Sequence, residues 1–194
     1  MPSRGQLEAI GAVAGVLLGS LFHFTYEWSG KSPAVAWFSG IDESVWSHLN
    51  LVNIPWLAMT AIIYFTVSSS DDVLFSRAVG FLTTLLAIAG VFYLYTLGHT
   101  RESVLAVDIT LFVAALVLGA YVSWVASRRW PDATKAKKVV GLGLHIVISA
   151  LLVAFTYWKP TDGEPFYAPE HDHGDDDEHD DRDGVVLPHA VPRR

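Results

Sequence analysis

The chain contains no cysteine among its 194 residues. This absence excludes disulfide bonds, thiolate metal sites and cysteine nucleophiles. Charged residues are also scarce, at 17% of the chain against about 25% in soluble domains. Hydrophobic residues make up 52% of the chain. The composition therefore indicates a membrane protein.

The few charges are unevenly distributed along the chain. Residues 1–158 contain nine acidic and nine basic residues, whereas residues 159–194 contain eleven acidic and four basic residues. The second segment therefore accounts for the whole net charge of −7. Because it lacks the apolar content needed to form a core, we expect a transmembrane domain over 1–158 and a disordered acidic tail over 159–194.

Five apolar segments are long enough to cross a bilayer, which requires about 20 residues in a helix. We expect an all-α, polytopic integral membrane protein, a bundle of five transmembrane helices at about 7–26, 45–67, 78–97, 104–125 and 139–158. The first segment could be mistaken for a signal peptide. Its apolar run is too long and aromatic residues close it, so we interpret it as a retained helix.

The orientation of the bundle is predicted from the loop between the fourth and fifth segments, which is rich in basic residues. It contains Arg128, Arg129, Lys135, Lys137 and Lys138. The positive-inside rule places this loop in the cytoplasm. We therefore expect a plasma-membrane protein whose N-terminus is cytoplasmic and whose tail is extracytoplasmic. We expect the protein to lie in the lipid bilayer and not to bind nucleic acid. A membrane-protein partner or a homo-oligomer is left open.

Ionisable residues cluster near the predicted outer ends of the helices. His23 closes the first segment, Glu43 and His48 open the second, and Asp108 lies a turn and a half inside the fourth. Such residues are costly in a membrane and are candidates for a functional site. We predict that these four form one outer-leaflet site. Secondary candidates are Glu27, Ser44, Asn50, His99, Glu102 and, in a deeper layer, His145.

The polar stretch at 42–50 begins the second helix. We expect Asp42 to be its N-cap and Glu43 to lie in its first turn, because carboxylates there satisfy backbone N–H groups and interact favourably with the helix dipole.

The residue types of the outer cluster leave several functions open. Two histidines and a carboxylate form a familiar ligand set for zinc or another divalent metal, with an open position for water or a small polar ligand. His23 and His48 as axial haem ligands are less favoured, and a small transporter is a further alternative. The main rival is a structural or partner-binding subunit without catalytic activity. No HExxH, GxSxG or phosphate-loop motif supports a named enzyme class.

The tail at 170–181 alternates histidine with acidic residues. His171, His173 and His179 could make it a loose metal-chelating segment. We favour a solubilising tail, because acidic runs are usually just solvated.

Several short strings resemble a known family. They are Leu-Phe-His-Phe at 21–24, Tyr-Glu-Trp at 26–28, Glu-Ser-Val-Trp-Ser-His-Leu at 43–49 and Val-Asp-Ile at 107–109. The chain resembles, over about residues 7–125, a family of small prokaryotic membrane proteins carried as a domain of unknown function. The Glu-Ser-Val-Trp-x-His string is its most specific feature. The family usually has Glu at the position of Ser47 and Lys at that of Asn50. The resemblance implies five membrane helices and no established activity.

Overall fold

The computed structural model describes residues 2–67, 72–96, 104–132 and 134–158. These residues form helices and no strand. The helices are α1 (Arg4–Trp28), α2 (Pro33–Ala36), α3 (Val45–Thr66), α4 (Val73–Thr96), α5 (Leu105–Arg129) and α6 (Lys135–Tyr157). All except α2 are long and apolar enough to cross a membrane. The predicted all-α, five-helix membrane fold is confirmed.

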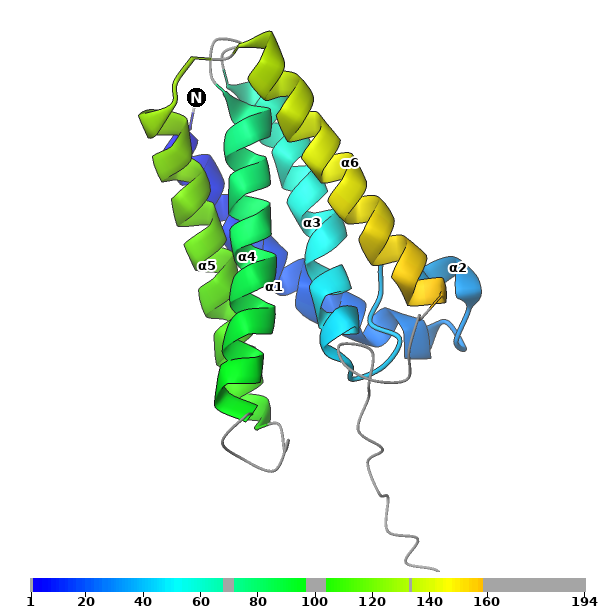
Figure 1. The fold of residues 1–194 in the computed structure, drawn as a ribbon. Coiled ribbons are helices and arrows are strands. Elements are labelled where there is room, and N and C mark those ends of the chain that lie inside the picture. The colour runs from blue at the N-terminus through cyan, green and yellow to red at the C-terminus, as the bar shows by residue number, and fades with distance from the viewer. Residues whose placement is uncertain (1, 68–71, 97–103, 133, 159–194) are drawn as a thin grey trace, which may run out of the picture.

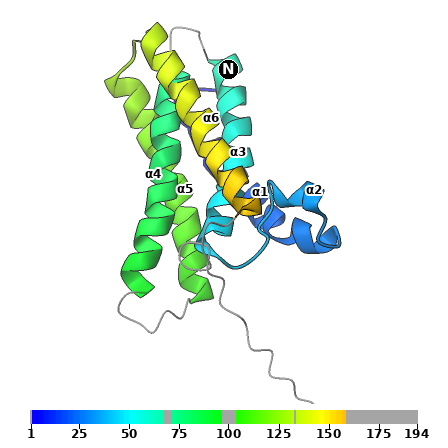
Figure 2. The same cartoon turned by 45° about the vertical axis from the view of Figure 1, so that its right-hand side comes forward.

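The five long helices form one bundle (Figure 1 and, turned by 45°, Figure 2). Helix α3 is the most buried of them. Helix α3 contacts α1, α4 and α6, while α5 packs against α4 and α1. As Figure 1 shows, the starts of α1, α4 and α6 and the ends of α3 and α5 lie together. We call this the basic end, because Arg4, Arg128, Arg129 and Lys137 belong to it. The opposite end contains His23, His48 and α2, and we call it the histidine end.

Four of the long helices, all except α3, extend further at the basic end than their apolar segments predict. Helix α1 begins at Arg4, where Ser3 and Gln6 form a capping box. Helix α6 begins at Lys135 because the Thr134 hydroxyl accepts a hydrogen bond from the Lys137 amide. A count of apolar residues stops at the first charge, whereas helical hydrogen bonding continues to the cap.

The N-cap of α3 is Ser44, so the prediction that Asp42 caps this helix is wrong. The Ser44 hydroxyl accepts a hydrogen bond from the Ser47 amide. The Asp42 carboxylate instead accepts hydrogen bonds from the Ser44 amide and from the hydroxyls of Ser44 and Ser47. The helix begins at Val45, as its apolar segment predicts, and Glu43 belongs to the preceding loop rather than to the first turn.

The core and the outer surface of the bundle are both apolar. Val52, Phe81 and Leu116 are almost completely buried where the helices meet. Large apolar side chains such as Phe65 and Leu105 are exposed on the outside, at 83% and 74% of their surface. In water such a surface would be unfavourable, whereas in hydrocarbon it is the expected one.

Candidate functional site

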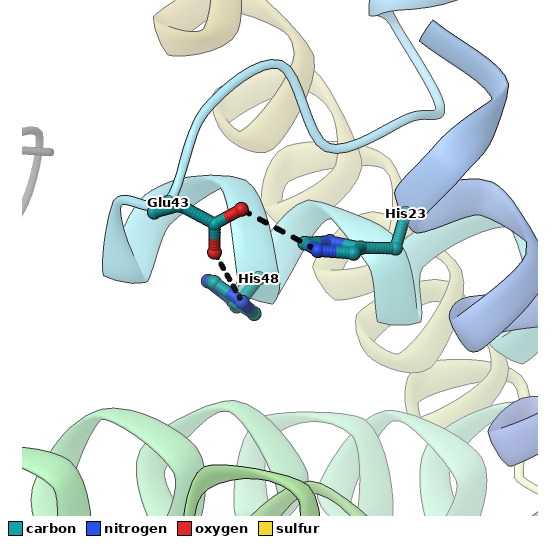
Figure 3. Close-up of side chains that lie close together, drawn as sticks. All are labelled: His23, Glu43 and His48. Atoms are coloured by element: carbon teal, nitrogen blue, oxygen red, sulfur yellow. Dashed lines mark ion pairs between the residues drawn. The ribbon is translucent and has the colours of Figure 1, made fainter. Parts of the chain in front are cut away.

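Three of the four predicted ligands meet at the histidine end. Nε2 of His23 lies 3.5 Å from Oε1 of Glu43, and Nε2 of His48 lies 3.8 Å from Oε2 of the same carboxylate. Figure 3 shows the carboxylate beside the two imidazole rings, with one oxygen directed at each ring. The ring centroids are 5.5 Å apart. One ligand atom from each residue can be chosen so that all three lie within 4.8 Å of one another. We call these three residues the His–Glu–His group.

Ser39 attaches the loop that carries Glu43 to the end of α1. Its hydroxyl donates a hydrogen bond to the Phe22 carbonyl and accepts one from the Tyr26 amide. These contacts satisfy backbone groups near the end of α1, beside His23. The next residue, Gly40, has no side chain, and a Cβ there would lie 3.3 Å from Nδ1 of His23. The loop can therefore lie directly against the His23 ring.

The other side of the Glu43 loop is attached to α3. The Asp42 carboxylate accepts hydrogen bonds from three groups of the first turn of α3, and Ser44 is the helix N-cap. Because residues 42 and 44 are both fixed, the backbone of Glu43 is held between α1 and α3. Only its side chain remains free to adjust.

The tautomer of His48 follows from its backbone contact. Its Nδ1 lies 2.8 Å from the Ser44 carbonyl oxygen, and a carbonyl can only accept a hydrogen bond. Nδ1 therefore carries a proton, and Nε2 is the ring nitrogen that faces Glu43. Metal-binding histidines are commonly oriented in this way, by donating the other ring N–H to a carbonyl or carboxylate.

The His–Glu–His group is accessible to small molecules. The side chains of His23 and His48 are 29% and 32% exposed, and that of Glu43 is 47% exposed. A metal ion or a water molecule could therefore reach the three ligand atoms without a rearrangement of the helices.

Asp108, the fourth predicted ligand, does not belong to this group. It lies in the first turn of α5 and accepts a hydrogen bond from the Tyr95 hydroxyl of α4. Glu27 is also elsewhere: it is exposed and lies 3.6 Å from the Lys31 ammonium. Both residues are at the histidine end, as their sequence positions predict, but each has a different neighbour.

The remaining candidates are dispersed. Ser44 caps α3, and the buried Asn50 donates a hydrogen bond from its amide to the Trp37 carbonyl. His145 is buried deeper, with Nδ1 directed at the Gly141 carbonyl and its ring stacked on Phe81. His99, Glu102, His171, His173 and His179 lie outside the described residues.

A second polar cluster, at the basic end, was not predicted from the sequence. The Glu8 carboxylate accepts a hydrogen bond from Arg77 at 2.6 Å and from Arg4 at 2.9 Å. The Ser123 hydroxyl donates a third, at 2.7 Å. Glu8 and Arg77 are 2% and 1% exposed, so this is a buried ion pair. We call Arg4, Glu8 and Arg77 the basic-end ion network.

Arg77 is enclosed by α3 as well as by α1. Its guanidinium donates hydrogen bonds to the Thr60 hydroxyl and the Trp56 carbonyl and lies 3.7 Å from the centre of the Trp56 ring.

Nearby, burial raises the pKa of Asp72, while the Phe75 amide and Lys137 oppose the shift. The sequence held one signal: Glu8 lies inside the first apolar segment, four residues after Arg4.

Comparison with known proteins identifies one similarity. The sequence pattern of a family of unknown function, DUF6512, matches residues 5–168. No curated protein matches the chain. No solved structure matches it either.

Proposed function

The chain belongs to the DUF6512 family, whose function is unknown, and we propose from the site geometry that it binds a divalent metal ion, best zinc, at the His–Glu–His group. The observation that carries this proposal is the convergence of two imidazole nitrogens and one carboxylate from α1, α3 and the loop before α3. With no cysteine in the chain, these are the ligand types available for zinc.

The distances are compatible with a metal ion after a small adjustment of the side chains. Two ligand atoms about 2.1 Å from a tetrahedral zinc ion lie about 3.4 Å apart. The separation between His23 Nε2 and Glu43 Oε1 is 3.5 Å, close to that value. The His48 contact, at 3.8 Å, would need a small rotation of the exposed Glu43 side chain. The Nδ1 hydrogen bond of His48 leaves its Nε2 lone pair available for the ion.

The geometry argues against haem. A haem iron takes axial ligands from opposite faces of a flat macrocycle, which must fit between the two rings. Here the Nε2 atoms of both imidazoles face the same carboxylate, and the ring centroids are only 5.5 Å apart. Three protein ligands would instead leave one position of a tetrahedral ion open, as in catalytic zinc sites. That position could hold water or a small ligand, whose reaction the ligand set does not define.

We expect the purified, chelator-treated protein to bind Zn²⁺ at this site and Glu43→Gln to weaken that binding by about tenfold or more, because one of three protein ligands loses its charge. Isothermal titration of Zn²⁺ into the full chain measures the affinity and the number of sites. His48→Ala should have the same effect. An absorbance spectrum of the untreated protein would reveal haem by its Soret band.

The matched control is Glu27→Gln. Glu27 is an exposed glutamate at the same end, and its charge lies beside Lys31 rather than beside a histidine. The Glu27→Gln variant should bind zinc with the affinity of the unmodified protein. If Glu43→Gln and Glu27→Gln gave the same isotherm, the assignment of the metal to the His–Glu–His group would be wrong, and any zinc bound would belong elsewhere, such as the tail.

We further propose that the His–Glu–His group faces the outside of the cell, because the opposite end carries the basic residues at the end of α5 and the start of α6. Two exposed alanines provide a matched pair of labelling positions: Ala34 in α2 and Ala136 in α6. Because the chain has no cysteine, Ala34→Cys and Ala136→Cys each create a single reactive site. An impermeant maleimide should label residue 34 in intact cells and residue 136 only after lysis. The reverse pattern would invert the orientation.

A further inference from the structure

A groove with a volume of about 600 Å³ runs along the bundle between α1 and α5. It extends from Gly5 and Trp124 at the basic end to Leu17 and Val113 near the middle of the two helices. Of the described residues that line it, Glu8 alone is charged, and that carboxylate is already held by Arg4 and Arg77. An occupant would therefore contact an almost entirely apolar wall.

The groove opens towards the surrounding membrane. Val13, Leu17 and Val117 line it and are each more than half exposed. A molecule already in the bilayer could enter sideways between α1 and α5, without passing through water. In hydrocarbon, the available occupants are lipid chains and other membrane helices.

The length of the groove distinguishes these two occupants. The stretch of α1 from Gly5 to Leu17 covers about 18 Å at the helical rise per residue. One leaflet contributes about half of the roughly 30 Å hydrocarbon core. The groove therefore matches an acyl chain of one leaflet, whereas a partner helix would require a groove across the whole core.

The charge at the basic end defines the headgroup. Arg4 is adjacent to Gly5, and its Nη1 atom is buried without a hydrogen-bond partner among the described residues. The Arg128 guanidinium lies 4.7 Å from the centre of the Trp124 ring, which lines the groove. Glu8 is shared by two arginines, so the basic-end ion network has an excess positive charge. An anion placed here would gain charge-assisted hydrogen bonds.

We propose that this groove binds one acyl chain of an anionic phospholipid, whose phosphate lies against Arg4 and Arg128. The apolar wall selects the chain, and the basic end selects the headgroup. The site is separate from the His–Glu–His group, which lies at the opposite end of the bundle.

The test compares the thermal stability of delipidated full-length protein in detergent with added phosphatidylglycerol or phosphatidylcholine of the same chain length. Phosphatidylglycerol should raise the unfolding temperature by about 5 °C or more at saturation, and phosphatidylcholine by clearly less. Native mass spectrometry should show one phosphatidylglycerol retained per chain.

Two variants and one control assign the effect to the groove. Ala9→Phe places a ring in the groove wall and should abolish the difference between the two lipids. Ala114→Phe, at an exposed alanine of α5 outside the groove lining, should preserve it. Arg128→Gln should reduce the phosphatidylglycerol effect selectively, and it decides the question alone if Ala9→Phe does not fold. Equal shifts with the two lipids, or a full difference retained in Arg128→Gln, would overturn the proposal.

Discussion

Glu8→Ala is expected to destabilise the bundle by about 3–5 kcal/mol, because it leaves the buried Arg77 without the carboxylate that neutralises it. Arg77 is 1% exposed and enclosed by Trp56 and Thr60, so its guanidinium cannot turn towards water. Equilibrium unfolding with SDS in mixed micelles measures the loss. Glu27→Ala is the matched control on the same helix, and its exposed contact with Lys31 should contribute about 0–1 kcal/mol at most.

The same network predicts strong non-additivity. Arg77→Ala alone should also be severely destabilising, because it leaves Glu8 buried with fewer partners. The double variant should cost clearly less than the sum of the two single changes, because the second substitution removes the charge that the first left unpaired. Additive losses would mean that Glu8 and Arg77 do not stabilise each other in the folded protein.

Gly141→Ala is expected to destabilise the protein by about 1–3 kcal/mol through overpacking. A Cβ at this position would lie 2.5 Å from the Leu74 carbonyl carbon and the Phe75 nitrogen. These are backbone atoms in the first turn of α4, so they cannot move aside as a side chain could. Helix α6 would have to separate from α4, which would weaken the packing of His145 on Phe81.

Gly143→Ala provides the control two residues further along α6. No atom lies within 4 Å of a Cβ at that position. Because alanine favours a helix over glycine by up to about 1 kcal/mol, this change should be neutral or slightly stabilising. Unfolding of both variants in the same detergent gives the comparison. A similar loss at the two positions would show that the effect is not the contact between α6 and α4.

The His–Glu–His group shows how far sequence reasoning reached. His23 and His48 were predicted to lie at the same end, because helical rise converts a residue's place in a segment into a depth. Asp108 was predicted at that end for the same reason. The sequence indicated the depth of these three residues. It did not indicate the direction in which each side chain points around its helix axis. Asp108 is directed towards Tyr95, and among the described residues Glu43 is the one that joins the two histidines.

The basic-end ion network shows the opposite case. Glu8 and Arg77 lie 69 residues apart. Glu8 lies inside the start of one apolar run and Arg77 directly before another, and the length of each run dominated the interpretation. A charged residue beside such a run is normally read as lying at the membrane surface. Here the pair is buried, because each charge finds its counter-ion on a neighbouring helix.

The sequence by itself determined the five helices long enough to span a membrane, the exclusion of thiol chemistry and the end of the bundle at which His23, His48 and Asp108 lie. These properties depend on composition, segment length and helical rise, all of which are local. The tertiary structure decided which helices are neighbours and which faces meet. It therefore decided that Glu43 contacts both His23 and His48 and that Glu8 pairs with Arg77. Helix order and rotation depend on packing across the whole bundle, as in the close contact at Gly141, and no single segment encodes them.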